Sequence, residues 1–213
     1  MATFFDVSGN AEVNTLVERC GYATAALTIL PIPGSEILGV MPLHVGMVIG
    51  IAGHYGHDLT TESATELILQ IGTTVGVSLV GSRLATTAAK FVLPGLGGII
   101  AAPFMFGSTL AIGACAAAWF ANDGAISSEE MRAVYKRTMK EAKANFRSEK
   151  MDDDEVKSQA ESAVQEGKKG GAAAEPEEED PVARLKRAKE LLEQGLIEQD
   201  EFDAVKKRIL DAI

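Results

Sequence analysis

Three histidines are the residues whose types and spacing could support metal or acid-base chemistry. His54 and His57 lie three positions apart and are followed by Asp58, and His44 lies ten positions before His54. Two imidazoles and a carboxylate suit a transition-metal ion. The closely spaced pair falls at an expected helix end, however, where nothing ensures that both rings face one ion. We therefore favour helix-end or interfacial histidines over a metal site.

No catalytic arrangement accompanies these histidines. The sequence has no Ser/His/Asp or Cys/His pattern in which a base would activate a nucleophile. Gly95, Gly97 and Gly98 superficially resemble a dinucleotide-binding loop, but they follow no expected strand. The sequence therefore predicts a protein without enzymatic activity and without a cofactor.

Two charged residues, Glu36 and Arg83, border apolar segments. They could pair across a helical hairpin or line a polar path, because charges at the edge of a membrane segment often serve function. Helix-end side chains that reach solvent are the simpler interpretation, which we favour.

The chain divides into an apolar body and a charged tail. Between Cys20 and Asn122 only six residues are charged, whereas 23 acidic and 17 basic residues follow from Asp123 onward. The net charge of −10 argues against nucleic acid as a partner, because a phosphate-binding surface needs a basic field. Cys20 and Cys115 show no CxxC spacing, so we expect two buried thiols in a reducing compartment. The N-terminal residues lack the pattern of a cleavable secretory signal.

The body is organised around residues 91–122, a stretch of 32 residues with no charge. As a helix, residues 99–120 would be long enough to cross the hydrocarbon core of a bilayer, which takes about 20 residues. Small residues at three- and four-residue spacings let helix backbones pack closely, and these are Gly107, Ala111, Gly113 and Ala117. We favour a membrane-spanning helix, and the alternative is the central helix of a soluble all-α domain.

Helical periodicity predicts an all-α fold, with an apolar bundle or apolar hairpins preceding the charged tail. We expect helices over 11–30, 36–55 and 61–84, separated by Pro31, Pro33 and Gly34 and then by a turn after His54. Ser35 is suited to cap the second helix, and Pro42 should kink it.

Four short motifs occur in an order that resembles a known family. They are Pro31 to Gly34, His54 to Gly56, Leu93 to Gly97 and Thr109 to Gly113. Over residues 11–145 the chain resembles the uncharacterised helical domain of YcjF-like proteins, which also occurs fused behind Era-like GTPases. The resemblance implies membrane association and no established catalytic activity. Because this chain has no GxxxxGK[ST] phosphate loop, any GTPase would be a separate partner.

A basic amphipathic helix is expected after Asn122. The segment from Ser127 to Glu130 has the spacing of a capping box. Basic residues then recur beside an apolar stripe, and they are Arg132, Lys136, Lys140, Lys143 and Arg147. These side chains are suited to contact anionic lipid headgroups, since each Lys or Arg near such a surface contributes about 1 kcal/mol. A solvated face of an ordinary helix is an equally good interpretation.

The sequence predicts three domains: the helical body over 1–150, a flexible acidic linker over 151–180, and a two-helix module over 181–213. A helical continuation before Gly167 is the alternative for the first part of the linker. The module resembles the short C-terminal domain called SHOCT, although Glu198 stands where that family usually has a Ser or Thr cap. The resemblance implies a role in oligomerisation. Two helices have too small a core to be stable alone, so we expect the module to pair with copies of itself or with the body. The apolar residues assigned to oligomerisation are Leu185, Leu192, Phe202, Val205 and Ile209.

The leading hypothesis is a membrane-associated scaffold that self-associates at the bacterial inner membrane, with the charged tail in the cytoplasm and a GTPase as a possible partner. A soluble GTPase-binding module in a homo-oligomer is the alternative. A channel or transporter is a third hypothesis, suggested by the helix breaks expected at Pro42 and Pro94.

Overall fold

The computed structural model describes residues 5–30, 35–75, 98–169, 181–193 and 197–211. Over these residues the chain is helical and contains no strand, which confirms the all-α class. The elements are α1 (Ala11–Leu27), α2 (Ser35–His54), α3 (Thr61–Thr74), α4 (Gly98–Ala121), α5 (Ser128–Ala144), the short 3₁₀ helix η3 (Ser148–Asp152), α6 (Asp154–Lys169), α7 (Pro181–Glu193) and α8 (Gln199–Asp211).

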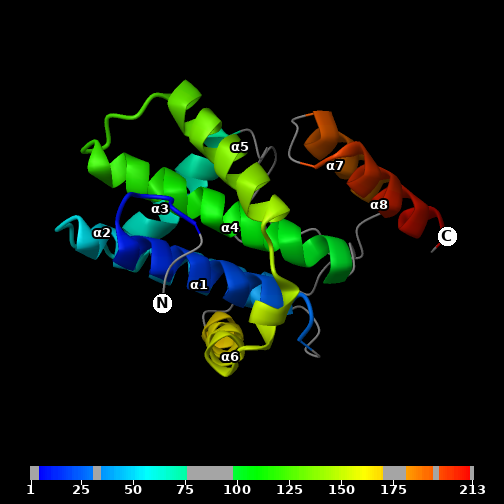
Figure 1. Ribbon diagram of the computed structural model, residues 1–213, viewed down its shortest axis with the longest axis horizontal. Coiled ribbons are helices and arrows are strands. Elements are labelled where there is room, and N and C mark those ends of the chain that lie inside the picture. The colour runs from blue at the N-terminus through cyan, green and yellow to red at the C-terminus, as the bar shows by residue number, and fades with distance from the viewer. Residues whose placement is uncertain (1–4, 31–34, 76–97, 170–180, 194–196, 212–213) are drawn as a thin grey trace.

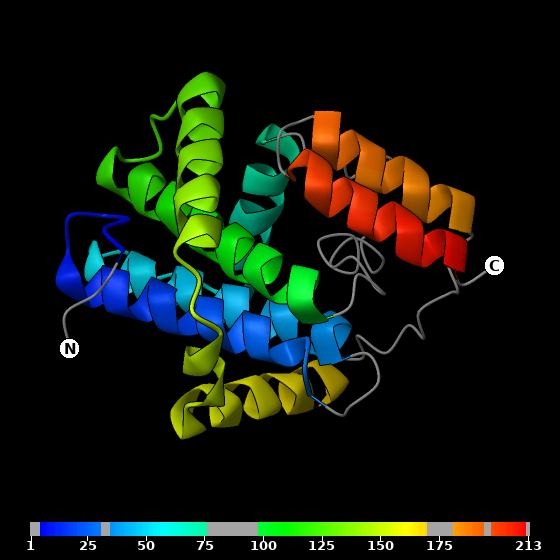
Figure 2. The ribbon, with the colours of Figure 1, turned by 45° about the vertical axis from the view of Figure 1, so that its right-hand side comes forward.

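Helix α4 lies at the centre of the body. It packs against α5 on one side and α1 on the other, and α2 and α3 complete its surroundings (Figure 1). Helix α6 packs across α1 and α2 on the side away from α5 (Figures 1 and 2). Helices α7 and α8 lie side by side as a hairpin.

Of the described helices, one is long and apolar enough to cross a membrane by length and composition, the 20-residue segment from Ala102 to Ala121 of α4. In the structure, 83% of the most apolar 18-residue window of that segment is buried inside the bundle. A core helix of a soluble protein meets the same criterion of length and composition, so the segment alone does not establish a membrane span.

Polar residues at the helix starts explain where several helices begin. Asn10 accepts hydrogen bonds from the backbone N–H groups of Glu12 and Val13 at the start of α1, and Thr60 caps α3 in the same way. At α5, Ser127 and Glu130 form the capping box expected from the sequence. After α4 the chain turns through Asp123 and Gly124, both with positive φ, which reverses its direction toward α5.

The small residues of α4 lie at close helix crossings. A Cβ atom on Gly113 would lie 2.7 Å from Val17 of α1, and one on Gly107 would lie 2.9 Å from the Lys143 side chain of α5. Ala111 and Ala117 are fully buried. The crossings are therefore made inside this chain, between α4 and its neighbours α1 and α5.

Residues 151–169 correct the expectation of a flexible linker. They form the end of η3 and all of α6, whose buried residues are Val156, Ala160, Ala163, Val164 and Gly167. Because this stretch is poor in apolar residues, the sequence predicted that most of it is linker, with a helical continuation before Gly167 as the alternative. The stripe of small side chains nevertheless lets α6 lie against α2 so closely that a Cβ atom on Gly167 would meet the Leu38 carbonyl oxygen at 2.1 Å. The helical body thus extends to Lys169, and residues 170–180 lie outside the described part.

Two helix boundaries also differ from the prediction. Helix α1 ends at Leu27 rather than residue 30, and the Ser35 hydroxyl donates to the Leu27 carbonyl at 2.7 Å. Ser35 is the first residue of α2 rather than its cap. Helix α3 is described only to Thr74, so its expected continuation to residue 84 lies outside the described residues.

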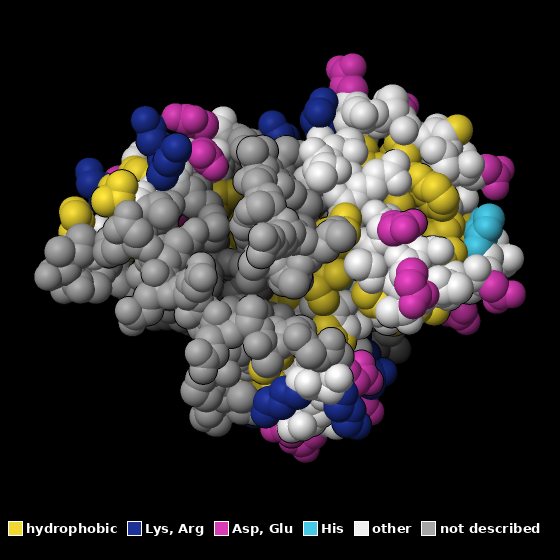
Figure 3. All heavy atoms as spheres, turned by 180° about the vertical axis from the view of Figure 1, so that it is seen from behind, with side chains coloured by type: hydrophobic (Ala, Val, Ile, Leu, Met, Phe, Trp, Pro, Cys, Tyr) yellow, Lys and Arg dark blue, Asp and Glu magenta, His cyan; other side chains and the backbone are white. Residues whose placement is uncertain are grey.

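On the face turned away from the viewer in Figure 1, hydrophobic side chains reach the surface beside acidic ones (Figure 3). Helix α2, which carries no charge between Leu38 and Gly53, contributes partly buried Met41, Val45 and Ile49. The surface of the body is therefore not uniformly polar.

Candidate functional site

Two features stand out as candidate sites: a buried chain of hydrogen bonds within the body, and a charged groove between α5 and α8. In the first, the His44 Nε2 atom of α2 lies 2.9 Å from the Thr109 hydroxyl of α4. That hydroxyl lies 2.8 Å from the hydroxyl of Thr24 on α1, which in turn donates to the Gly21 carbonyl at 2.8 Å. We refer to this arrangement as the His44–Thr109–Thr24 chain.

The direction of every hydrogen bond in this chain follows from the number of hydrogens. A hydroxyl has one hydrogen to donate, and that of Thr24 is used by Gly21. Thr109 must therefore donate to Thr24, and His44 must donate to Thr109 through a hydrogen on Nε2. The opposite direction would leave the Thr24 and Gly21 oxygens 2.8 Å apart with no hydrogen between them. His44 is thus the tautomer protonated at Nε2.

The other ring nitrogen of His44 is a bare acceptor. His44 is 2% exposed, and its Nδ1 atom has no hydrogen-bond partner among the described residues. Burial lowers the pKa of His44 from 6.5 to about 4, because a charged imidazolium is poorly solvated there. A proton added at Nδ1 would have no acceptor, so the closed bundle holds His44 neutral. The chain joins α1, α2 and α4, and sequence reasoning missed Thr24 and Thr109 as its members.

The structure does not bring the three histidines together. His44 lies in the core, whereas the His54 ring lies 3.6 Å from the Glu12 carboxylate and the His57 ring packs against Phe120 with centroids 5.3 Å apart. Among the residues with a described position, no group of three or more His, Cys, Asp or Glu could hold a metal ion. Neither interpretation of Glu36 and Arg83, as solvent-facing helix-end residues or as a pair, can be followed within the described residues, since Arg83 belongs to 76–97.

Both cysteines are buried thiols. Burial raises the pKa of Cys20 to about 11 and that of Cys115 to about 12, so both are protonated at neutral pH. Cys20 accepts a hydrogen bond from the Gln159 amide of α6, and Cys115 donates to the Met131 carbonyl of α5. They serve as packing residues between helices, not as nucleophiles.

The basic residues of α5 do not share one free face. Arg132 donates to the Thr74 carbonyl at the end of α3, at 2.7 Å. Lys143 lies 2.5 Å from the Glu201 carboxylate of α8, and the two side chains are 14% and 20% exposed. Lys136, Lys140 and Arg147 are exposed. Arg132 and Lys143 therefore make structural contacts, and Lys136 and Lys140 remain on the open surface of α5.

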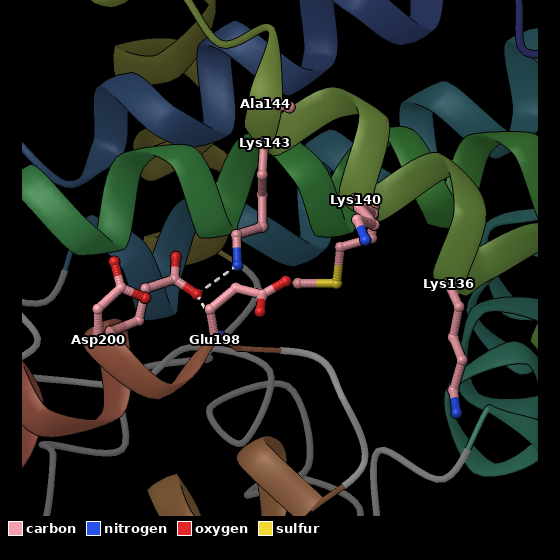
Figure 4. Close-up of a pocket in the computed structure, with 8 residues that line it drawn as sticks. Lys136, Lys140, Lys143, Ala144, Glu198 and Asp200 are labelled. Atoms are coloured by element: carbon pink, nitrogen blue, oxygen red, sulfur yellow. Dashed lines mark hydrogen bonds and ion pairs between the residues drawn. The ribbon is translucent and has the colours of Figure 1, made fainter.

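The charged groove lies between α5 and the start of α8 and has a volume of about 380 Å³. Its α5 wall carries Lys136, Met139, Lys140, Lys143 and Ala144, and its α8 wall carries Glu198, Asp200 and Glu201. Lys143 points toward α8, whereas Lys136 extends away at the far end of the groove (Figure 4). Lys143 is therefore the lysine of the α5 wall that is paired with a carboxylate of α8.

Glu201 also holds the start of α8. Its carboxylate accepts a hydrogen bond from the backbone N–H of Glu198 at 2.7 Å, as the third residue of a capping box does. The backbone half of a cap is therefore present although Glu198 replaces the Ser or Thr of the SHOCT pattern. The sequence analysis assigned a role to Lys143 but not to Glu201. The sequence signal for Glu201 is that it follows Glu198 by three residues, the spacing of a capping box.

The residues assigned to oligomerisation are occupied within this chain. Val205 and Ile209 are buried with Ala188 in the hairpin, and Leu185 and Phe202 pack against them. Leu192 packs against the main core, which also takes up Leu191 and Ile197. Their part in oligomerisation stays a prediction. Two apolar side chains of the hairpin, Val182 and Leu210, are 70% and 53% exposed.

Comparisons of the chain with protein-family models, curated proteins and solved structures give no match. The resemblances to YcjF-like proteins and to the SHOCT module therefore stay expectations from the sequence.

Proposed function

We propose that this protein is a non-enzymatic helical scaffold that attaches as a folded bundle to the cytoplasmic face of a bacterial membrane and associates there with copies of itself. A separate GTPase is the partner that the YcjF-like resemblance suggests. The observation that carries the proposal is the contrast between α4, a buried helix of membrane length, and α5, which packs on it and keeps Lys136 and Lys140 on its outer surface.

Attachment to the surface fits this packing better than insertion. If the intact bundle entered the bilayer, the charged outer side chains of α5 would enter hydrocarbon with α4. Each Lys or Arg at the bilayer centre costs about 2.5–3.5 kcal/mol by insertion scales. At the headgroup level the same lysines are favourable, by about 1 kcal/mol each near anionic lipid.

Co-sedimentation with lipid vesicles tests this proposal. The full chain should bind vesicles containing phosphatidylglycerol, bind phosphatidylcholine vesicles far less, and be released by salt. Lys136→Gln with Lys140→Gln should weaken binding by about tenfold or more, since two such contacts are lost. The matched control is Lys168→Gln with Lys169→Gln, which removes two exposed lysines from α6 on the opposite side of the body. Equal binding to neutral vesicles, or equal loss in both double variants, would contradict the proposal.

The burial of α4 specifically favours a second candidate function, a soluble GTPase-binding module in a homo-oligomer. Fractionation of expressing cells separates the two. Protein found in the soluble fraction before any wash supports the soluble module. Protein that sediments with membranes and is released by high salt or carbonate supports surface attachment, and resistance to both would indicate insertion.

Self-association makes a separate prediction for the exposed apolar residues of the hairpin. Val182→Ser with Leu210→Ser should lower the mass of the assembly in solution, because both side chains are exposed in the single chain. Light scattering measures that mass. An unchanged mass of the assembly would show that the exposed hairpin residues Val182 and Leu210 do not mediate self-association.

A further inference from the structure

We propose that α8 is a displaceable cover over the lysines of α5, and that an anionic membrane surface takes its place when the protein binds lipid. This inference rests on the proposed function and adds to it a competition between the C-terminal hairpin and the membrane for the same side chains.

Charge complementarity identifies the occupant. The groove is lined by Lys136, Lys140 and Lys143 of α5 and by Glu198, Asp200 and Glu201 at the start of α8, and Lys143 points toward α8 (Figure 4). A carboxylate and a lipid phosphate present the same kind of anionic oxygen to a lysine ammonium. The start of α8 therefore occupies the position that lipid headgroups would take. With α8 in place Lys143 is 14% exposed, so the row loses its third lysine to the hairpin.

The contacts that hold α8 suit a reversible cover. Among the described residues one ion pair joins Lys143 to Glu201, and beside it the hairpin packs Leu191, Leu192, Ile197 and Phe202 in or against the main core. An anionic bilayer offers many phosphates to a row of three lysines, whereas α8 directly pairs Glu201 with one of them. When the bilayer replaces α8, several contacts between lysines and lipid phosphates replace the single Lys143–Glu201 ion pair.

The hairpin keeps its internal contacts when it leaves α5. Ala188, Val205 and Ile209 form a buried cluster between α7 and α8 that does not involve the body. The Glu201 carboxylate also caps Glu198 within the hairpin, and that hydrogen bond does not depend on Lys143. Displacement therefore breaks contacts between the hairpin and the body while α7 remains paired with α8.

The first test uses the wild-type full chain and phosphatidylglycerol vesicles. Hydrogen exchange of residues 197–211 should become faster when the protein is bound to vesicles, because α8 has left the body. Exchange in α4, at the centre of the body, should not change. A bound protein whose α8 exchanges as slowly as before would overturn the cover while leaving the proposed membrane attachment intact. Absence of vesicle binding would overturn both.

The second test alters the ion pair in the full chain. Glu201→Gln removes the charge but keeps an oxygen that can cap Glu198, and it should raise the affinity for these vesicles at least threefold. Glu190→Gln is the matched control, since it removes one exposed acidic charge from α7 of the same hairpin. Adding Lys143→Gln to Glu201→Gln should abolish the gain. Equal vesicle affinities for Glu201→Gln and Glu190→Gln would overturn the proposal. A larger assembly mass of Glu201→Gln without tighter lipid binding would also overturn it, because a second copy of the chain would then occupy the exposed surface.

Discussion

Two helices from the charged second half of the chain, α6 and α8, attach to the apolar body by different means. Helix α6 buries a stripe of Val and Ala residues and brings Gly167 against the backbone of Leu38. Helix α8 meets the body through the Lys143–Glu201 ion pair beside the charged groove, and Phe202 and the preceding Ile197 also pack in or against the main core. Both are amphipathic helices rich in charge, so overall composition does not distinguish them.

The difference lies in what each contact requires. The α6 contact depends on shape, because only a residue without a side chain fits between the two backbones. The ion pair in the α8 contact depends on charge and is weakened by salt or by a competing anion, whereas the apolar contacts beside it are not. A contact that depends on shape, such as that of α6, suits a permanent part of the fold. An ion pair such as Lys143–Glu201 can be replaced by a contact with another anion. The predictions below test this contrast.

The largest effect is expected from Gly167→Ala. Alanine normally stabilises a helix relative to glycine by about 0.5–1 kcal/mol. Here its Cβ atom would lie 2.1 Å from the Leu38 carbonyl oxygen, a backbone atom that cannot rotate away. We expect a loss of about 3 kcal/mol in the free energy of unfolding, measured in urea. Gly46→Ala in α2 is the control, since its Cβ would meet no atom within 4 Å, and it should stabilise the protein. The same sign for both variants would contradict the shape argument.

The second largest effect concerns the His44–Thr109–Thr24 chain. Thr109→Val removes the acceptor of the His44 Nε2–H group and leaves a buried donor unpaired, so we expect a loss of about 2 kcal/mol. Thr24→Val should cost less, because the Thr109 hydroxyl can then donate to a carbonyl of its own helix. Urea unfolding of Thr109→Val and Thr24→Val measures which of the two loses more free energy of unfolding. Equal costs would mean that the deduced direction of the hydrogen bonds is wrong.

The sequence predicted the described helices more successfully than their contacts. The capping-box spacing of Ser127 and Glu130 and the long apolar runs are local signals, and α1 begins at Ala11 and α5 after the capping box as the sequence predicted. The packing of α6 on the body was missed, because burial of its alanines depends on a partner surface that sequence periodicity does not reveal. The sites were missed for a similar reason. Thr24 and Thr109 are 85 positions apart, and Lys143 and Glu201 are 58 apart, so neither pairing has a local signal.

A third prediction concerns acid. The pKa of His44 is about 4 in the folded protein, below the ordinary 6.5 of an exposed histidine, and burial is the only cause among the described residues. The unfolded chain therefore binds the proton more readily, and the stability contribution present above pH 6.5 is lost as the pH falls toward 4. The expected loss is about 1.4 kcal/mol per pH unit within that window. Urea unfolding at pH 7.5, 6.5 and 5.5 measures it, and His44→Leu should remove this part of the slope.

The smallest effect on stability is expected from Glu201→Gln. The Lys143–Glu201 pair is partly exposed, and a glutamine keeps an oxygen for the Glu198 N–H group, so unfolding of the body should change by less than about 1 kcal/mol. Addition of salt should reduce even this difference. If calorimetry showed instead that Glu201→Gln costs as much as Gly167→Ala, the α8 contact would be as permanent as the α6 contact. A small, salt-dependent cost together with tighter vesicle binding would mean that charge sets the position of α8 while shape sets that of α6.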